Sequence, residues 1–170
     1  MQIARDVFLE ILKDAYSAYY TLRTDVACEF PLAFRADYAA RDERYWLTKS
    51  VKMWGNEKNE FCYVFAAESF DRALAEKCVD WAIADMRPRV RPHGEHQCTN
   101  VKVLFVADSL DREVQAFLKK KRFTKSYRFG LHGYTNLLAG AVDLTTQQTV
   151  TNPEGHELAP FIKKLFAARA

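Results

Sequence analysis

The residues best suited to chemistry are concentrated in one short segment, residues 87–98, which reads Arg-Pro-Arg-Val-Arg-Pro-His-Gly-Glu-His-Gln-Cys. The segment holds three arginines, a cysteine and two of the four histidines of the chain. Its two prolines and one glycine disfavour regular structure, so we expect a loop, and loops commonly carry binding sites on a rigid scaffold. Arg89 and Arg91 are the side chains that we expect to contact an anionic ligand.

The same segment contains part of a zinc-binding pattern. His93, His96 and Cys98 offer imidazole nitrogen and thiolate sulfur, which zinc accepts in a tetrahedral arrangement. A closed site needs a fourth ligand, for which His132 and Asp108 are the candidates, and the stronger signature of two Cys-x-x-Cys pairs is absent. The alternative interpretation is that the two loop histidines form hydrogen bonds with the loop backbone.

Two of these candidates stand at the predicted ends of strands. Asp108 follows a buried-strand signal at residues 101–107, and open α/β sheets bind ligands at the carboxyl ends of parallel strands. Its alternative role is to cap, together with Ser109, a helix predicted to begin at Leu110. His132 stands between two glycines, where it could act as an acid, a base or a ligand near neutral pH, or be exposed on a tight turn.

Lys49 is an unusual residue for its position. It shares a face with apolar residues of a strand predicted at 44–54, and an unpaired buried ammonium group is costly. It must therefore reach solvent, pair with Glu43 or Glu60, or line a polar cavity. A restriction-nuclease arrangement, in which an acid is followed by Glu-x-Lys on adjacent strands, is absent from the predicted strands.

Charge is distributed unevenly along the chain. Residues 1–85 hold 11 Lys and Arg against 15 Asp and Glu, a balance of −4, whereas residues 86–170 hold 14 against 7, a balance of +7. Six basic residues lie between positions 119 and 128, and part of this run is explained by the favourable interaction of cations with a helix carboxyl end. The basic half could steer an anionic small molecule or bind nucleic acid, although no nucleic-acid-reading motif accompanies it.

Hydrophobic periodicity predicts the elements that must position these residues. They are a helix at about 3–22, an irregular segment at 24–42, a hairpin of strands 44–54 and 60–67, a helix from Ser69 to about Arg87, a strand at 101–107, a helix at 110–121, a strand at 126–131, antiparallel additions at 136–144 and near Val150, and a last helix at about 154–168. The strand-helix-strand order over 101–131 predicts one parallel βαβ crossover. We therefore expect an α+β fold, a single globular domain over residues 1–170, whose mixed sheet has an N-terminal hairpin, this one crossover and flanking helices.

Composition excludes some classes of protein. The longest apolar run, residues 61–67, is far shorter than the roughly 20 residues of a membrane-spanning helix, so we expect no membrane partner. The N-terminus lacks a signal-peptide pattern, which predicts a cytoplasmic protein, and the four cysteines are then expected to be free thiols. The aromatic content of 14% would suit a homodimer interface as well as a core.

Several short motifs resemble those of a group of small prokaryotic proteins with no assigned function. The motifs are Leu47-x-Lys49, Trp54, Asn59-Glu60, Pro92-His93-x-Glu95-His96, Phe129-Gly-Leu-His-Gly133 and Val142-Asp-Leu144. The resemblance covers about residues 43–156, and Gln97 and Tyr134 depart from it, because methionine and tryptophan are the commoner types there. It implies no activity, cofactor or catalytic residue.

The leading hypothesis from the sequence is a binding or regulatory domain whose polar cleft, formed by the 87–98 loop and the His132 turn, accepts an anionic small molecule. The alternative is a metal-dependent enzyme, such as a hydrolase, in which His93 and His96 hold a divalent ion such as zinc with Asp108 or His132. Glu95 or Lys49 would then assist the reaction, and an open coordination position would admit substrate. A structural or interaction protein is the third possibility.

Overall fold

The computed structural model describes residues 3–41 and 57–168 of the chain. Its elements follow the chain in this order: α1 (Arg5–Ser17), β1 (Thr21–Arg23), β2 (Leu32–Arg41), β3 (Glu57–Ala67), α2 (Arg72–Met86), the 3₁₀ turn η2 (Arg87–Arg89), β4 (His96–Ala107), α3 (Arg112–Lys120), β5 (Thr124–Ser126), the 3₁₀ turn η3 (Arg128–Gly130), β6 (Tyr134–Asp143), β7 (Gln148–Thr151) and α4 (Leu158–Ala167).

One mixed sheet organises the described residues. Its strand order is β1-β2-β3-β4-β6-β5, and β7 pairs with part of β6. The three central strands, β3, β4 and β6, are parallel to one another, and the outer pairings are antiparallel. Because parallel neighbours need a crossover, α2 connects β3 to β4 and α3 connects β4 to β6. The same ends of the three central strands therefore meet at the same edge of the sheet.

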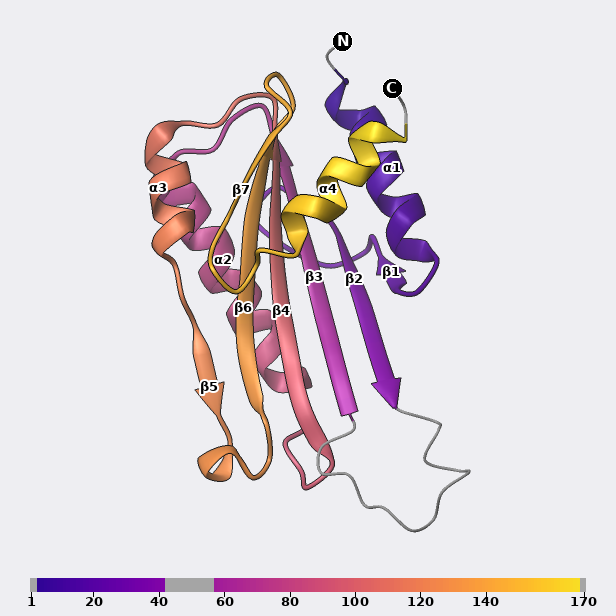
Figure 1. The fold of residues 1–170 in the computed structure, drawn as a ribbon, viewed down its shortest axis with the longest axis vertical. Coiled ribbons are helices and arrows are strands. Elements are labelled where there is room, and N and C mark those ends of the chain that lie inside the picture. Colours follow the sequence, from indigo (N-terminus) through magenta and orange to yellow (C-terminus); the bar gives the residue numbers. More distant parts are fainter. Residues whose placement is uncertain (1–2, 42–56, 169–170) are drawn as a thin grey trace.

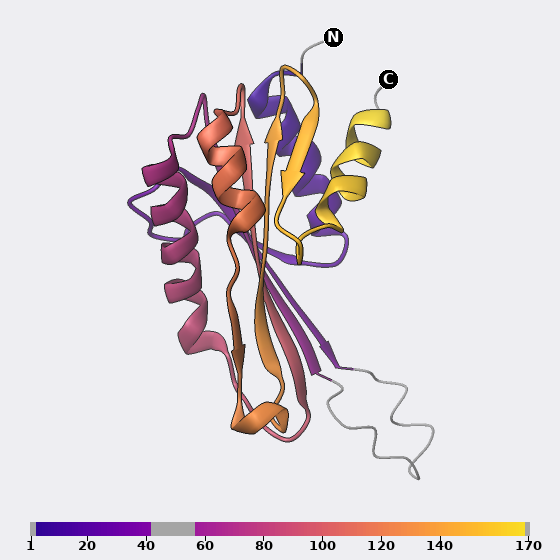
Figure 2. The ribbon, with the colours of Figure 1, turned by 60° about the vertical axis from the view of Figure 1, so that its left-hand side comes forward.

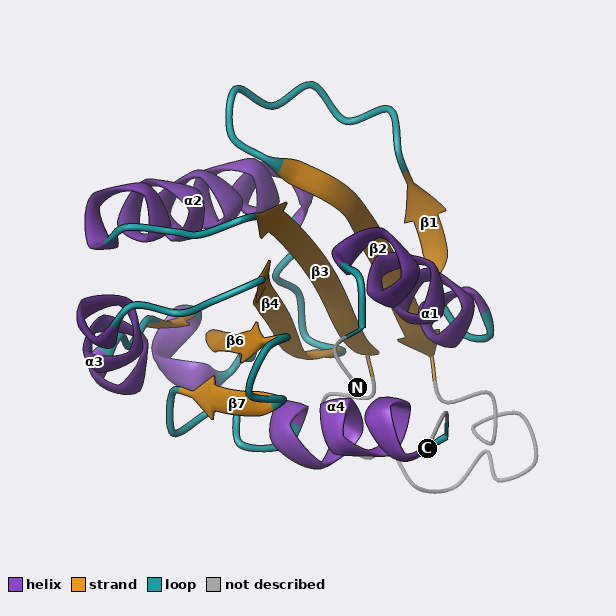
Figure 3. Ribbon diagram, turned by 90° about the horizontal axis from the view of Figure 1, so that it is seen from above, coloured by secondary structure: helices purple, strands orange, loops and turns teal. Residues whose placement is uncertain are grey.

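Helices cover both faces of this sheet (Figure 1, Figure 3). The α2 and α3 helices lie on one face, and α1 and α4 lie side by side on the other (Figure 2). Side chains of β4 alternate between the two layers: Val103 and Phe105 pack under α2 and α3, whereas Leu104 and Val106 pack under α1 and α4. Because parallel strands are usually covered on both faces, these residues on both sides of β4 are apolar.

The α1 and α4 layer is closed by aromatic contacts. The rings of Phe8 and Phe166 stack with centroids 5.0 Å apart, and Tyr16 meets the edge of Phe161 at 5.5 Å. Aromatic side chains contribute large buried areas, so these contacts join the first and last helices of the described chain to one core.

The predicted α+β class with a mixed sheet is confirmed, but the strand assignments need three corrections. There are two parallel crossovers rather than one, because β3 is also parallel to β4 and is connected to it through α2. The crossover that was predicted ends in residues 134–143, expected as an antiparallel addition, which form the parallel strand β6. Residues 126–131, predicted as the parallel strand, are mostly the η3 turn, in which Arg128 and Phe129 have positive φ. The segment left irregular contains β2, since Pro31 precedes that strand instead of interrupting it.

The first strand of the predicted hairpin, residues 44–54, lies outside the described residues. The antiparallel partner of β3 within them is β2, with Ala36 opposite Cys62. The N-terminal hairpin is therefore an antiparallel pair whose described strands are 32–41 and 57–67.

A single buried amide joins three segments at the edge of the sheet. The Asn152 side chain is 1% exposed and uses all its hydrogen-bonding groups. Its Oδ1 accepts from the backbone N–H of Ala139 and Gly155 at 3.0 and 2.7 Å, and its Nδ2 donates to the carbonyls of Lys121 and Leu137 at 3.0 and 2.9 Å. Asn152 thus fixes the end of α3, the middle of β6 and the approach to α4.

Replacement of Asn152 by alanine should lower the free energy of unfolding by about 2–4 kcal/mol, because buried backbone donors and acceptors lose their partners. Urea unfolding with an unchanged m value measures this loss. Asn136→Ala is the matched control, since the amide of Asn136 accepts a hydrogen bond from Thr124 at an exposed position and its removal should cost under about 1 kcal/mol. Equal losses in the two variants would contradict the prediction.

Candidate functional site

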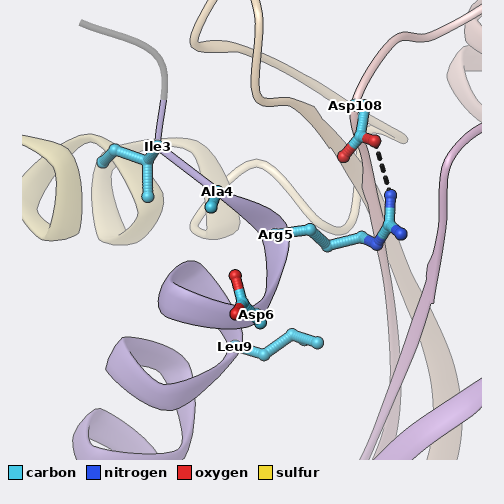
Figure 4. A pocket seen from close by; sticks show the side chains of 6 residues that line it. All are labelled: Ile3, Ala4, Arg5, Asp6, Leu9 and Asp108. Atoms are coloured by element: carbon cyan, nitrogen blue, oxygen red, sulfur yellow. Dashed lines mark ion pairs between the residues drawn. The ribbon is translucent and has the colours of Figure 1, made fainter.

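Asp108 lies at the carboxyl edge of the sheet, directly after β4, beside a hollow of about 510 Å³. Figure 4 shows the Arg5 side chain reaching from the start of α1 toward this carboxylate. The Arg5 Nη1 and Asp108 Oδ2 atoms are 2.6 Å apart, and each side chain is about one third exposed, at 32% and 37%. The hollow is lined by Ile3, Ala4, Arg5, Asp6, Leu9 and Asp108.

The alternative role considered for Asp108, capping of the next helix, is wrong. The N-cap position of α3 is Asp111, and the carboxylate of Asp143 accepts the backbone N–H of Leu110 at 3.0 Å. Asp108 is instead tied to Glu68 and Thr145 through its backbone, by bonds of 3.1 and 3.2 Å. Its side chain is therefore directed to Arg5 and the hollow.

His96 lies at the other end of β4 and is buried, with 1% of its surface exposed. Its Nδ1 lies 2.7 Å from the carbonyl oxygen of His132, and its Nε2 lies 2.8 Å from the hydroxyl of Thr99. Because a carbonyl oxygen only accepts, Nδ1 must donate to it, and Nε2 is paired with the Thr99 hydroxyl. Both nitrogens are occupied, so His96 supports the fold and offers no free ligand atom.

Gly133 is required by this arrangement. A Cβ atom there would lie 2.5 Å from the carbonyl oxygen of His96 and 2.7 Å from its Nδ1, and the φ of Gly133 is +78°. The second glycine beside His132 therefore allows the His132 turn to approach His96, which explains a motif that the sequence alone left ambiguous.

The predicted metal site of His93, His96, Asp108 and His132 is not assembled. Asp108 and the histidines lie at opposite ends of β4, whose 12 residues span roughly 35 Å at the usual rise of a strand. Among residues 3–41 and 57–168, no three histidine, cysteine, aspartate or glutamate side chains are grouped to hold a metal ion. The 87–98 loop and the His132 turn do lie together, through the contact of His96 with the His132 carbonyl, but Asp108 does not share a site with them. Lys49 lies outside the described residues.

The 87–98 loop contributes several of its polar groups to local structure. Arg89 Nη1 lies 3.0 Å from the Asp85 carboxylate and also donates to the Asp85 carbonyl. The Nδ1 of His93 accepts the backbone N–H of Glu95 at 3.2 Å. Arg91 and Glu95 are exposed. Of the predicted ligand-binding set, His93, His96 and His132 lie together, and Asp108 lies with none of them.

Asp85 is the centre of a buried ionic network that involves Arg89. Arg35, which is 7% exposed, binds Asp37 through two hydrogen bonds of 2.7 and 2.9 Å and reaches Asp85 at 3.2 Å. The Tyr63 hydroxyl donates to the same Asp85 oxygen at 2.7 Å. Arg89 is therefore one of two arginines that neutralise Asp85, which makes it a poor candidate for ligand contact.

A second, partly buried network was not expected from the sequence. Lys102, on β4, lies 2.9 Å from Glu60 of β3 and 2.8 Å from Glu157, which precedes α4. The Tyr20 hydroxyl donates to Glu60. The signal that could have revealed this network was a lysine inside the apolar run 101–107, in phase with Leu104 and Val106.

The surroundings of Lys102 keep it charged. Burial alone would lower the pKa of its ammonium group, but the charge of Glu60 and hydrogen bonds to Glu157 and Glu60 raise that pKa above its usual value. Burial raises the pKa of the Cys62 thiol to about 12, and Glu60 adds to this effect while Lys102 opposes it. With a cationic lysine and a protonated thiol, the network stabilises the sheet and does not provide an activated nucleophile.

Comparison with known proteins gives a family but no activity. Residues 5–164 match a family model described as a domain of unknown function (DUF8052), which confirms the resemblance to an uncharacterised family and extends it well beyond residues 43–156. No curated protein and no solved structure matches the chain. Among the described residues, none of the helices is both long and apolar enough to cross a membrane.

His96→Ala should lower the free energy of unfolding by about 2–4 kcal/mol, because the His132 carbonyl and the Thr99 hydroxyl lose their partner in the interior. Chemical denaturation measures the change. His156→Ala is the control: its ring is exposed and contacts the Pro153 carbonyl, so its loss should stay within about 0.5 kcal/mol. A His96 variant as stable as the control would show that the ring does not have this structural role.

Thiol labelling with an aromatic disulfide at pH 8 should spare Cys62 and Cys78 in the folded protein. Burial raises the pKa of each thiol to about 12, so almost no thiolate is present for attack. Cys28, which is partly exposed, should react first, and its replacement by serine should remove that early phase. Rapid labelling of Cys62 before addition of urea, measured by mass spectrometry, would contradict the buried network.

Proposed function

The chain belongs to the domain family of unknown function DUF8052, whose description assigns no activity, and we propose from its own geometry that it is a binding domain for a small polar molecule at the carboxyl edge of the sheet. The observation that carries the proposal is the hollow of about 510 Å³ beside the Arg5 and Asp108 pair. Binding pockets for small molecules commonly have volumes of roughly 300–1,000 Å³, and α/β sheets place them at the carboxyl ends of parallel strands.

The ion pair supplies recognition groups of both signs. Arg5 Nη1 is shielded from solvent, and its short contact with Asp108 is not aligned as a hydrogen bond, so the guanidinium keeps donor capacity for a ligand. A surface ion pair of this exposure contributes only about 0–1 kcal/mol to stability. A ligand can therefore separate Arg5 from Asp108 at little cost to the fold.

The charges of the hollow select the class of ligand. Asp6 and Asp108 outnumber Arg5, so a purely anionic molecule would meet two carboxylates. A zwitterion fits better: its carboxylate or phosphate would bind Arg5, and its ammonium or hydroxyl groups would bind Asp108. The sequence favoured an anionic ligand at the 87–98 loop and the His132 turn, whereas the hollow lies elsewhere and favours a ligand that also donates hydrogen bonds. Ile3 and Leu9 provide an apolar wall for its carbon skeleton.

The experiment is a nuclear magnetic resonance titration of the labelled protein with individual free amino acids and, separately, with inorganic phosphate. At least one amino acid should shift the amide signals of residues 3–9 and 107–110, and phosphate alone should shift them much less. Arg5→Gln and Asp108→Asn should each lower the affinity of the protein for that amino acid roughly tenfold, since a charge-assisted hydrogen bond is worth about 1.5–3 kcal/mol.

Arg112→Gln is the matched control for these variants, because Arg112 is an exposed arginine at the start of α3 and does not line the hollow. The control should bind the amino acid as tightly as the wild type does. The free energies of unfolding of all three variants should lie within about 1 kcal/mol of the wild-type value. The proposal fails if no amino acid shifts the signals around the hollow, or if the Arg5 and Asp108 variants bind as tightly as the control.

A further inference from the structure

The η3 turn presents an apolar tip at the amino edge of the sheet, the end of the molecule opposite the hollow (Figure 1). Phe129 is 105% exposed and Leu131 is 62% exposed, and the adjacent Tyr134 is 38% exposed. Other bulky apolar side chains of the described residues are mostly packed in the two cores. A phenylalanine held fully in solvent at the end of a turn needs a reason beyond the packing of the fold.

The tip is held by the backbone and by His96. Tyr127 N–H donates to Gly133, while the N–H groups of Gly130 and His132 both donate to the Tyr127 carbonyl, at 3.0 and 3.1 Å. The buried ring of His96 binds the His132 carbonyl at 2.7 Å. Hydrogen bonds therefore hold the turn together and attach it to β4, so the backbone that carries Phe129 and Leu131 is held in place.

The backbone of the tip adopts a conformation that non-glycine residues rarely occupy. The φ angles of Arg128 and Phe129 are +46° and +54°, two consecutive residues in the left-handed region. In this conformation the Phe129 ring is fully exposed and gains no packing contact from the fold. Strained backbone of this kind is concentrated at sites that bind something.

The surroundings of the tip are cationic. The turn and its flanking strands, residues 124–134, carry Lys125 and Arg128, and the neighbouring segment 90–97 adds Arg91 against the single acid Glu95. The Lys125 ammonium lies 5.5 Å from the centre of the Tyr127 ring. The partner is therefore expected to carry negative charge around an apolar region.

We propose that the η3 turn docks on an anionic phospholipid surface, with Phe129 and Leu131 inserted among the acyl chains and Lys125 and Arg128 at the headgroups. The two side chains with Tyr134 offer on the order of 400 Å², whereas a stable protein interface needs about 800 Å² from each partner. Binding to a bilayer requires no such area, since the shallow insertion of apolar side chains and the attraction of nearby cations to anionic lipid both add to the affinity. The expectation of no membrane partner rested on the lack of a spanning segment, which surface docking does not need.

The test is cosedimentation of the full chain with vesicles of phosphatidylcholine and phosphatidylglycerol, and with vesicles of phosphatidylcholine alone. The wild type should bind the anionic vesicles and bind the neutral ones much more weakly. Phe129→Ala combined with Leu131→Ala should weaken binding roughly tenfold or more, because two apolar side chains no longer leave water. A Phe129→Trp variant should show a blue-shifted emission with anionic vesicles, which charge attraction alone does not produce.

Tyr19→Ala is the matched control, because Tyr19 is 80% exposed and lies after α1, away from the turn. It should bind vesicles as the wild type does. Arg5→Gln and Asp108→Asn should also bind vesicles as the wild type does, so a failure of the lipid proposal can be distinguished from a failure of the proposed ligand site. The lipid proposal is overturned if the wild type does not bind anionic vesicles, if the double variant binds them equally well, or if neutral vesicles bind as tightly. Self-association that is lost in the double variant, without vesicle binding, would identify a protein interface instead.

Discussion

The pairing of β4 with a parallel strand on each side is the constraint on which the rest of the structure depends. β4 bonds to β3 over most of its length and to β6 from Cys98 to Ala107, so both neighbours take their register from it. Parallel strands must be reached through crossovers and must be covered on both faces, which requires the two helical layers. The length of β4 also separates the hollow at Asp108 from the turn beside His96, and the two regions can therefore act independently.

Burial of β4 on both faces explains why polar residues on or beside it are paired. Lys102 meets Glu60 and Glu157, and His96 meets Thr99 and the His132 carbonyl. Breaking such a buried pair by removing one partner is far more costly than the net value of the pair, because the remaining group keeps its desolvation penalty. His96 looked available for chemistry in the sequence but is for this reason committed to the fold. Arg5 and Asp108, each about one third exposed, can exchange partners.

The sequence predicted the elements with strong periodicity and missed those defined by distant partners. The helices near residues 72–86, 112–120 and 158–167 and the strand at 101–107 follow directly from apolar spacing. The parallel direction of residues 134–143 could not be derived from the sequence, because it depends on the end of the sheet to which the chain returns after α3. The placement of Asp108 at a sheet edge was predicted correctly, but its pairing with Arg5 joins residues about a hundred positions apart, and no local pattern encodes that contact.

The packing of α1 against α4 also constrains the order in which the molecule can fold. Phe8 stacks on Phe166, and the core beneath these helices contains residues from both ends of the described chain. During synthesis from the N-terminus, the layer of α2 and α3 can form over β3, β4 and β6 before α4 exists. In the other layer α1 can pack on the sheet by then, but it lacks its contacts with α4. Because contacts of such long sequence separation form slowly, closure of the α1 and α4 layer should be the late event, and the nascent chain would expose the part of α1 that contacts α4 until then.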